Sequence, residues 1–209
     1  GATSMVSTRG QVVFGNQNWS TRVDGVNELA PEIRAWSVAR GEFFTNADVR
    51  SAARVLVLGN TVAEKLFPGI DPIGQIVRLN NLPFQVSGVL GAKGQTLTGQ
   101  DQDDMIAVPY TTVQKKLRRS SLATIDNAMI STASPLASRV AETQITELMR
   151  QRHNIRSGQD DDFRVRNLAD VAAAAEQTTL ILTLLLGSIA AVSLIVGGIG
   201  IMNIMLVSV

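Results

Sequence analysis

From Thr178 to Val209 the chain carries no charged residue. A run this long exceeds the roughly 20 apolar residues that a helix needs to cross a membrane, and it therefore predicts a membrane-spanning helix. As a helix the run would be about 48 Å long, at about 1.5 Å per residue. The hydrocarbon core of a bilayer is only about 30 Å thick. We therefore expect a lipid bilayer as a partner, and a helix that tilts, kinks or leaves the bilayer at one end.

Small residues gather on one face of this predicted helix. Their positions alternate between steps of three and four, and they are Ala190, Ser193, Gly197 and Gly200. In lipid, small residues let two helix backbones approach closely, and packing drives the association. The spacing predicts that this face packs against another membrane helix. The alternative is a single anchor in which the glycines are incidental, because glycine is common in membrane helices.

The charged residues all precede the apolar run, with Glu176 the last of them. The 19 basic and 18 acidic residues give a net charge of +1, and no basic stripe with interleaved aromatic residues occurs. We therefore expect no nucleic acid as a partner. The absence of cysteine excludes a disulfide framework and a cysteine metal site. Because the chain does not start with Met and stops inside the apolar run, we expect it to be a piece of a larger membrane protein.

The part before the run reads as an α+β domain. Residues 5–26 alternate weakly between apolar and polar, which indicates short strands with turns at Arg9-Gly10 and at Gly15-Asn16. Further strands are predicted at Val55–Leu58 and Met105–Val108, with a β-hairpin formed by Gln75–Leu79 and Phe84–Leu90.

A β-α-β unit is predicted after residue 125. It consists of a strand at 126–132, an amphipathic helix with Ser134 as its N-cap and Pro135 in its first turn, and a strand from Asp162 to Asn167. The connection is long enough for parallel strands.

The last helix is expected to begin before the membrane. Asp170 can act as its N-cap, and Val171 begins an Ala-rich amphipathic segment that reaches Glu176 without a turn residue. Residues Asp170, Val171 and Glu176 therefore mark a predicted stalk that joins the soluble domain rigidly to the span. A rigid helix transmits displacement, whereas a Gly/Ser linker would lose it.

No catalytic signature is present. The sequence lacks a phosphate-binding loop, a dinucleotide fingerprint and a nucleophile elbow. Its one histidine, His153, follows the predicted helix and is interpreted as a helix C-cap rather than a metal ligand or base. Asp160 to Asp162 are interpreted as a solvated turn beside the Arg-rich helix end. We expect no enzyme activity, cofactor or metal in this chain.

Several segments resemble the MacB-type ABC transporter permeases. The most specific is Ser193–Val209, SLIVGGIGIMNIMLVSV, which resembles the second membrane helix of that family. The others are Leu66–Leu90, Asp103–Thr112, LMRQRHNI with DDFRV between Leu148 and Val165, and GNQNW at Gly15–Trp19. One departure is Gly41-Glu42, where many members have Gly-Arg.

The resemblance implies a domain organisation. Residues 1–175 would form a periplasmic domain, with a porter-like part at about 1–33 and 126–170. A β-rich inserted subdomain would occupy about 34–125. Residues 176–209 would form the stalk and transmembrane helix, so that the chain lies in the bacterial inner membrane with 1–175 in the periplasm.

The resemblance also implies a mechanism and partners. Such permeases are homodimers that work with a periplasmic adaptor of MacA type and an outer-membrane duct of TolC type. They export macrolides, peptides or siderophores, and ATP and Mg²⁺ would bind in an ATPase domain outside this chain. The expected mechanism is mechanotransmission, in which ATP hydrolysis in the cytoplasm moves the periplasmic domain through the membrane helices.

Two other functions are compatible with the residues. One is a lipoprotein-releasing permease or an FtsX-like permease that regulates cell-wall hydrolases. The other is a membrane-anchored periplasmic binding protein without a motor. The long segment at 34–125 favours the MacB pattern, and a nucleotide-binding motif upstream in the parent gene would exclude the anchored binding protein.

Overall fold

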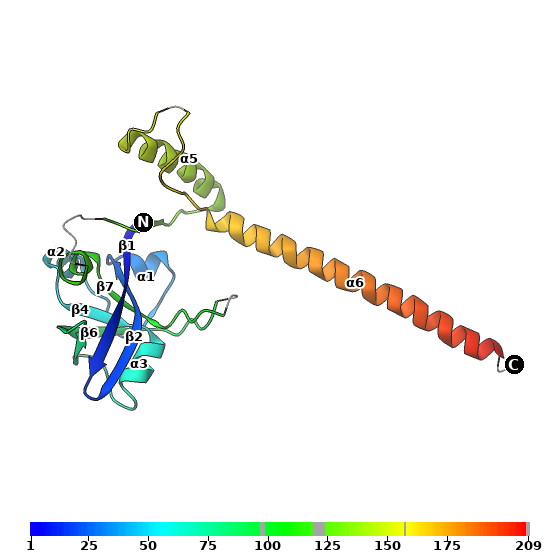
Figure 1. Ribbon diagram of the computed structural model, residues 1–209, viewed down its shortest axis with the longest axis horizontal. Helices are drawn as coiled ribbons and strands as arrows, with labels where there is room; N and C mark the ends of the chain where they lie inside the picture. Colours follow the sequence, from blue (N-terminus) through cyan, green and yellow to red (C-terminus); the bar gives the residue numbers. More distant parts are fainter. Residues whose placement is uncertain (97–98, 119–123, 157, 208–209) are drawn as a thin grey trace. The chain divides into compact units, whose positions relative to one another are not determined.

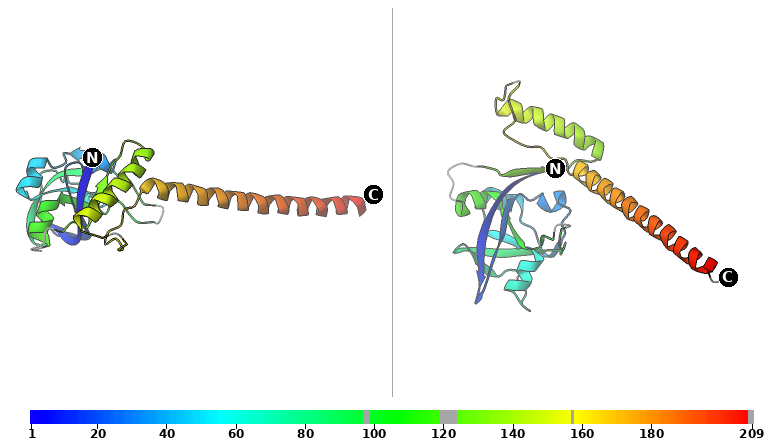
Figure 2. Two further views of the ribbon diagram at one scale, coloured as in Figure 1. Left: turned by 90° about the horizontal axis from the view of Figure 1, so that it is seen from above. Right: turned by 45° about the vertical axis from the view of Figure 1, so that its right-hand side comes forward.

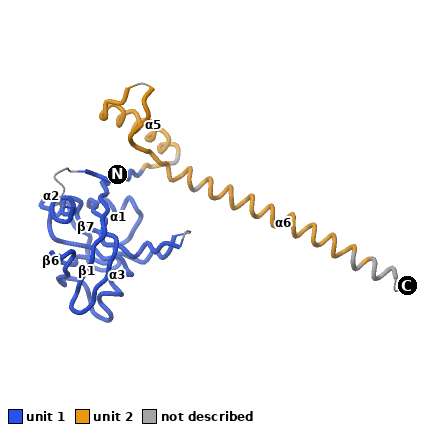
Figure 3. Tube along the Cα trace, viewed as in Figure 1, with its two compact units in different colours: residues 1–131 blue, residues 132–209 orange. Residues whose placement is uncertain are grey.

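The computed structural model describes residues 1–96, 99–118, 124–156 and 158–207; the side chains at 135, 172, 200, 201 and 203–207 are not described. The chain divides into two compact units, Gly1–Ser131 and Thr132–Val209, which are coloured separately in Figure 3. Every strand in these described ranges lies in the first unit, whereas the second unit contains helices.

The first unit is built from β-strands and short helices (Figure 1). Its strands are β1 (Ala2–Phe14), β2 (Gln17–Val26), β3 (Val38–Gly41), β4 (Val55–Leu58), β5 (Ile76–Leu79), β6 (Leu82–Leu90), β7 (Met105–Pro109) and β8 (Asn127–Ile130). Its helices are α1 (Ala30–Ile33), α2 (Asn46–Ser51), α3 (Asn60–Leu66), α4 (Tyr110–Thr112) and a π-helical turn, η1 (Val113–Leu117).

Backbone pairing closes six of these strands into a ring. Hydrogen-bonded neighbours follow the order β2-β7-β4-β6-β5-β1, and β1 pairs in turn with β2. The β1–β2 pair is an antiparallel hairpin, whereas β2 and β7 run parallel. β3 and β8 are added to the ring on β6 and β1. Ring closure removes sheet edges that could otherwise pair with another chain.

The core lies on both faces of β4 and β7. Leu56 and Ile106 belong to one buried apolar cluster, whereas Val57 and Ala107 belong to a second. Because successive side chains of a strand point to opposite faces, the two clusters lie on opposite sides of the sheet. Both strands read as continuous apolar runs, VLVL and MIAVP, as expected for strands buried on both sides.

The α+β class and most of the predicted strands are confirmed. The hairpin of β5 and β6 turns at Asn80-Asn81, where both residues have positive φ, 49° and 67°. The turn at Gly15-Asn16 is also confirmed. Strands β4 to β7 share the ring with β1 and β2, and the division of the domain at about residues 33 and 125 stays a prediction.

The predicted turn at Arg9-Gly10 is wrong, because β1 runs through it without interruption. Gly10 is buried opposite β5, and a Cβ atom there would lie 2.6 Å from Cδ1 of Leu79. Glycine at this position leaves room for the side chains of Leu79 and Val23 rather than forming a turn.

The second unit contains α5 (Pro135–Arg152) and α6 (Leu168–Val207). The predicted start of α5 is confirmed, since the Ser134 hydroxyl accepts a hydrogen bond from the amide of Ala137 at 3.1 Å. α6 has 40 residues and is continuous through the predicted stalk, which corresponds to a length of about 60 Å. Figure 2 shows this helix from two further directions.

The predicted strand at Asp162–Asn167 is not formed, so the β-α-β unit lacks its second strand. The alternation on which it was based is present, since Phe163 and Val165 are half-buried and Arg164 is exposed. The segment instead lies beside the end of α5, where Asp162 is paired with His153 at 2.8 Å. Alternation of apolar and polar residues indicates which side chains are buried, and it can occur in a segment that has no partner strand.

Candidate functional site

α6 is long and apolar enough to cross a membrane. The qualifying part is Leu168–Ile199. Its most apolar 18-residue window has a mean hydropathy of 2.5, and none of that window is buried within the chain. Large apolar side chains are exposed along this helix, including Leu184, Leu194 and Val196. Side chains of this kind are stable in lipid or against other apolar helices, which is consistent with the predicted span.

The predicted packing face lies on α6. Ala190, Ser193 and Gly197 are exposed, and a Cβ atom built on Gly197 would meet nothing within 4 Å. The Ser193 hydroxyl donates to the carbonyl of Ile189 at 2.9 Å, so its polar group is satisfied within the helix. Gly200 belongs to α6, but its surroundings lie outside the described part of the chain. Contact of this face with another membrane helix stays a prediction.

The predicted N-cap of α6 is wrong. The helix begins at Leu168, and the side-chain oxygen of Asn167 accepts the amide of Ala169 at 3.1 Å. Asp170 therefore lies inside the first turn, where a carboxylate still interacts favourably with the positive end of the helix dipole. Its carboxylate is 3.5 Å from the guanidinium of Arg139 on α5. The first helical turn is thus tied to α5 by side chains that the sequence did not identify as partners.

Val171 and Glu176 occupy the stalk as predicted. Both side chains are exposed, and Val171 is 58% exposed. Threonines follow on the same helix, and their hydroxyls are satisfied within it: Thr178 donates to Ala174 and Thr179 to Ala175. The transition from the stalk to the apolar run therefore occurs without a break in the helix, and the coupling role of these residues stays a prediction.

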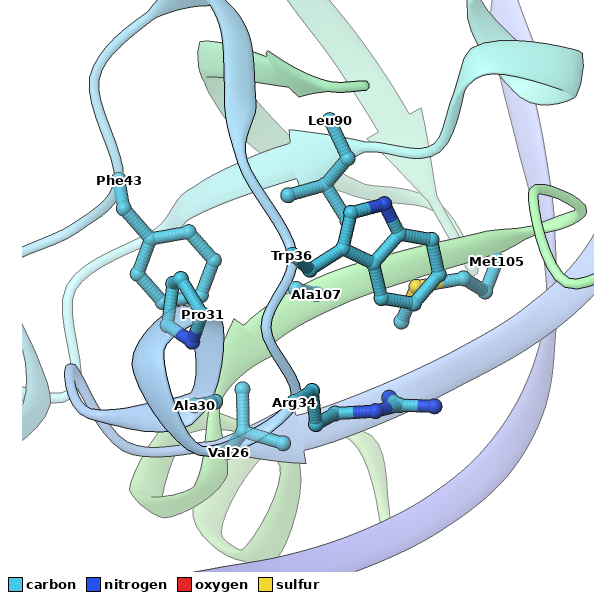
Figure 4. A pocket seen from close by; sticks show the side chains of 9 residues that line it. All are labelled: Val26, Ala30, Pro31, Arg34, Trp36, Phe43, Leu90, Met105 and Ala107. Atoms are coloured by element: carbon cyan, nitrogen blue, oxygen red, sulfur yellow. The ribbon is translucent and has the colours of Figure 1, made fainter. Parts of the chain in front are cut away.

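The structure also contains an apolar pocket in the first unit, here called the Trp36 pocket (Figure 4). It is lined by Val26, Ala30, Pro31, Arg34, Trp36, Phe43, Leu90, Met105 and Ala107. Its empty space, including the part open to solvent, is about 260 Å³. The indole Nε1 of Trp36 donates to the carbonyl of Gly91 at 2.7 Å, which fixes the ring against the pocket wall.

Two cations lie over the ring of Trp36. The guanidinium carbon of Arg34 is 5.0 Å from the ring centroid and Nζ of Lys93 is 4.9 Å from it. Lys93 also donates from Nζ to the carbonyl of Arg34 at 2.6 Å. Cations at these distances are attracted by the negative face of an aromatic ring.

Asp24 lies beside Arg34 and is fully buried. Its carboxylate accepts hydrogen bonds from the Ser7 hydroxyl at 2.9 Å and from Arg22 at 3.2 Å, and Arg34 approaches to 3.5 Å. Burial lowers the pKa of the Arg34 guanidinium, and the charge of Asp24 opposes that shift. A buried carboxylate requires such partners, because an unpaired charge in the interior is very costly.

Neither Trp36 nor Asp24 was singled out as a site residue in the sequence. A usable signal existed for Asp24, since a single carboxylate inside the otherwise apolar strand end VDGV requires a buried partner. No comparable signal existed for the pocket, because its lining comes from three stretches that are far apart in the sequence: 26–43, Leu90 and 105–107. Among the described residues, no group of three or more His, Cys, Asp or Glu side chains is placed to hold a metal ion.

Residues 1–148 match the family model of the MacB-like periplasmic core domain. The "Macrolide export ATP-binding/permease protein MacB" of Syntrophobacter fumaroxidans is 36% identical, covering 100% of this chain and 36% of that protein. The protein of the same name from Azoarcus sp. is 46% identical, over 84% of this chain and 26% of that protein. The "Pyoverdine export ATP-binding/permease protein PvdT" of Pseudomonas fluorescens is 43% identical, over 95% of this chain and 29% of that protein. The chain thus spans between 26% and 36% of the length of these relatives.

Two solved structures share the fold. The periplasmic region of MacB from Actinobacillus actinomycetemcomitans has a TM-score of 0.67 and 26% identity, covering 84% of this chain and 75% of that one. The extracellular domain of the ABC-type transporter YknZ from Gram-positive bacteria has a TM-score of 0.64 and 20% identity, over 79% of this chain and 80% of that one. The second likeness concerns the fold alone.

Proposed function

This chain belongs to the family of MacB-like periplasmic core domains, and from that membership we propose that it couples ATP hydrolysis in the cytoplasm to export by mechanotransmission. It is part of an ABC-type efflux permease, an inner-membrane protein with a periplasmic segment. In the proposed mechanism, residues 1–175 move in the periplasm when α6 is displaced by events on the other side of the membrane.

The observation that supports this mechanism is the continuity of α6. A single helix begins at Leu168, passes Asp170, Val171 and Glu176, and enters the apolar run. A continuous helix moves as a stiff rod over this distance, whereas a flexible linker would absorb the displacement. In the first turn of α6, the carboxylate of Asp170 lies 3.5 Å from the guanidinium of Arg139 on α5, an exposed ion pair that contributes little stability.

The cargo and the partners form a second part of the proposal. Relatives are named for export of macrolides and of pyoverdine, so the cargo is taken to be a macrolide, a peptide or a siderophore. The parent protein would act as a homodimer with an adaptor of MacA type and a duct of TolC type. Its ATPase domain would bind ATP and Mg²⁺, and the face of Ala190, Ser193, Gly197 and Gly200 would pack against another membrane helix.

The domain would be organised as a porter-like part at about 1–33 and 126–170 and an insert at about 34–125. Residues 34–125 contribute four of the six ring strands, β4 to β7, and these strands pair in the ring with β1 and β2.

The experiment that tests the mechanism breaks the stiffness of the stalk. A Gly-Ser-Gly-Ser insertion between Asp170 and Thr178 in the full-length transporter should leave ATP hydrolysis largely intact and abolish export. Unchanged export in that variant would exclude mechanotransmission through α6.

A further inference from the structure

Three exposed cations of the first unit lie beside the contact between α2 and the segment formed by α4 and η1. They are Arg50, Arg54 and Lys115, and together with the half-buried Lys116 they are here called the α2–η1 patch. We propose that this patch binds an acidic segment of a partner polypeptide. The inference goes beyond the proposed export function, because it concerns recognition of another protein and can be measured without transport.

Hydrogen bonds hold the two parts of the patch together. Three side chains of the later segment donate to backbone carbonyls at the end of α2 and just after it: Thr111 to Val49 at 2.5 Å, Thr112 to Ala53 at 2.8 Å and Lys116 to Ala52 at 2.9 Å. Arg50, Arg54 and Lys115 each neighbour one of these residues in the sequence, so their Cα atoms lie about 3.8 Å from it. The fold thus brings the cations to one part of the surface on a fixed backbone.

Carboxylates are scarce around the patch. Residues 46–54 and 110–117 contain four cations, all of them in the patch, and one carboxylate, Asp48. The carboxylate of Asp48 accepts the amide and the hydroxyl of Thr45 at 2.8 and 2.7 Å, which hold it at the start of α2. The whole chain, by contrast, is nearly neutral, with a net charge of +1. The two segments therefore carry a local excess of positive charge.

The exposed cations of the patch also lack partners. Among the residues that the structure describes, the side chains of Arg50, Arg54 and Lys115 take part in no ion pair. Arg34 and Arg118 of the same unit, which are less exposed, each have a carboxylate partner. The charge of the patch is therefore not neutralised by the described part of the chain and is available to a partner.

The backbone under the two lysines is unusual. Val113–Leu117 forms a π-helical turn, and the amide of Arg118 donates to the carbonyl of Val113 at 2.8 Å. Such turns are rare and occur frequently at functional sites. This one places Lys116 against α2 and leaves Lys115 exposed beside it, which supports a role for this surface in binding.

The composition of the patch selects the class of partner. Basic segments that bind membrane surfaces combine their cations with exposed Trp, Phe or Leu side chains. Residues 46–54 and 110–117 contain no exposed large apolar side chain. Sites for small ligands are concave, whereas these cations are exposed and come from separate turns. Carboxylates spaced along a polypeptide match such a surface, because each can form its own charge-assisted hydrogen bonds.

The test uses the whole chain in detergent micelles, labelled uniformly with ¹⁵N. The probe is an acetylated and amidated peptide of eight glutamates, and a peptide of eight glutamines is its neutral control. The amide signals of Arg50, Arg54 and Lys115 report on the patch. The amide signals of Arg40 and Arg78, two exposed arginines on β3 and β5, report on other parts of the first unit.

The glutamate peptide should shift the signals of the patch saturably, with a dissociation constant of about a millimolar at low ionic strength. The glutamine peptide should cause no shift. The double variant Arg50→Gln/Lys115→Gln should bind the glutamate peptide about fivefold more weakly, because two exposed ion pairs are lost. The matched control is Arg40→Gln/Arg78→Gln, which removes the same charge from exposed positions on strands and should change binding by less than about twofold.

Equal loss of affinity in the two double variants would assign binding to the overall charge and would overturn the proposal. Absence of any shift at Arg50, Arg54 and Lys115 would overturn it as well. A third contradicting result is a larger response of these signals to short-chain phosphatidylglycerol than to the glutamate peptide at equal negative charge, which would assign the patch to lipid. All four substituted side chains are exposed, so the variants leave the core unchanged.

Discussion

Arg118 and Asp126 form a two-point ion pair in which one guanidinium nitrogen donates to Oδ1 of Asp126 at 2.8 Å and a second donates to Oδ2. Oδ2 also accepts the backbone amide of Ser7 at 2.9 Å. The pair therefore fastens the residue that precedes β8 to the middle of β1. The hydrogen bond from Arg118 lowers the pKa of Asp126 below its ordinary 3.8, against the opposing effect of burial.

Asp126→Asn should loosen this attachment. Loss of the charge removes the ion pair, which is worth about 1 kcal/mol for a partly exposed pair, so exchange of the Ser7 amide should become about fivefold faster. Hydrogen exchange of the whole chain in micelles measures this effect. Asp71→Asn is the control, because Asp71 also accepts a backbone amide, from Ile73, but pairs with no cation among the described residues.

The same pair makes attachment of β8 dependent on pH. Because the folded pKa of Asp126 lies below 3.8, the stabilisation is fully present above that value and is lost as the pH falls through the lower folded pKa. The exchange rates of the natural chain and Asp126→Asn should therefore differ near pH 6 and converge once the pH has fallen below the lowered pKa of Asp126. An equal ratio at both pH values would contradict the assignment of the effect to this carboxylate.

Asp24→Ala should be among the most destabilising changes in the first unit. It would leave Arg34, whose side chain is 22% exposed, beside Trp36 without its counter-charge. Removing one partner of a buried pair costs about 3–5 kcal/mol, whereas Arg22→Ala, at a side chain 42% exposed, should cost about 0–1 kcal/mol. The stability of the two variants is compared by urea unfolding followed through tryptophan fluorescence. Equal unfolding midpoints would show that the pair of Asp24 and Arg34 does not stabilise the fold.

Local patterns in the sequence predicted much of this fold. The apolar runs that became β4 and β7 and the Ser134 cap of α5 depend only on neighbouring residues, and they are confirmed. The N-cap of α6 was misplaced on local grounds, since Asn167 rather than Asp170 accepts the amide of Ala169. The failed turn at Arg9-Gly10, in contrast, depends on a partner far along the chain. Glycine is common in turns, and Gly10 was therefore predicted to lie in one. Its close contact with Leu79 cannot be inferred from the sequence.

The same limit applies to the sites. The predicted stalk is a local feature, and its helical continuity is confirmed by α6. The Trp36 pocket could not be predicted, because Trp36, Leu90 and Met105 meet only through the order of strands in the ring. Asp24 could have been singled out as a buried charge, but its partner Arg34 lies after a turn whose path the sequence leaves open.

Gly197→Leu should impair assembly or transport of the full-length protein. On the proposed packing face, a large side chain would push two helices apart, and overpacking of a fitted interface costs roughly 1–3 kcal/mol. Leu194→Ala and Leu185→Ala lie off the face of Ala190 and Ser193 and should matter less. Transport is compared in membranes with equal protein levels. Full transport by Gly197→Leu, with loss in the two controls, would show that the packing face is wrong.

The coupling role of α6 is tested most directly by two insertions of equal length between Glu176 and Gln177 of the full-length transporter. The two inserts add the same number of residues. Four alanines continue the helix and rotate its membrane-spanning part by about 40°, whereas Gly-Ser-Gly-Ser interrupts its stiffness. The measurement is the amount of substrate exported per ATP hydrolysed. Mechanotransmission predicts that both variants hydrolyse ATP, that the alanine variant retains export, and that export by the Gly-Ser variant falls to background. Equal export per ATP in the two variants would contradict it.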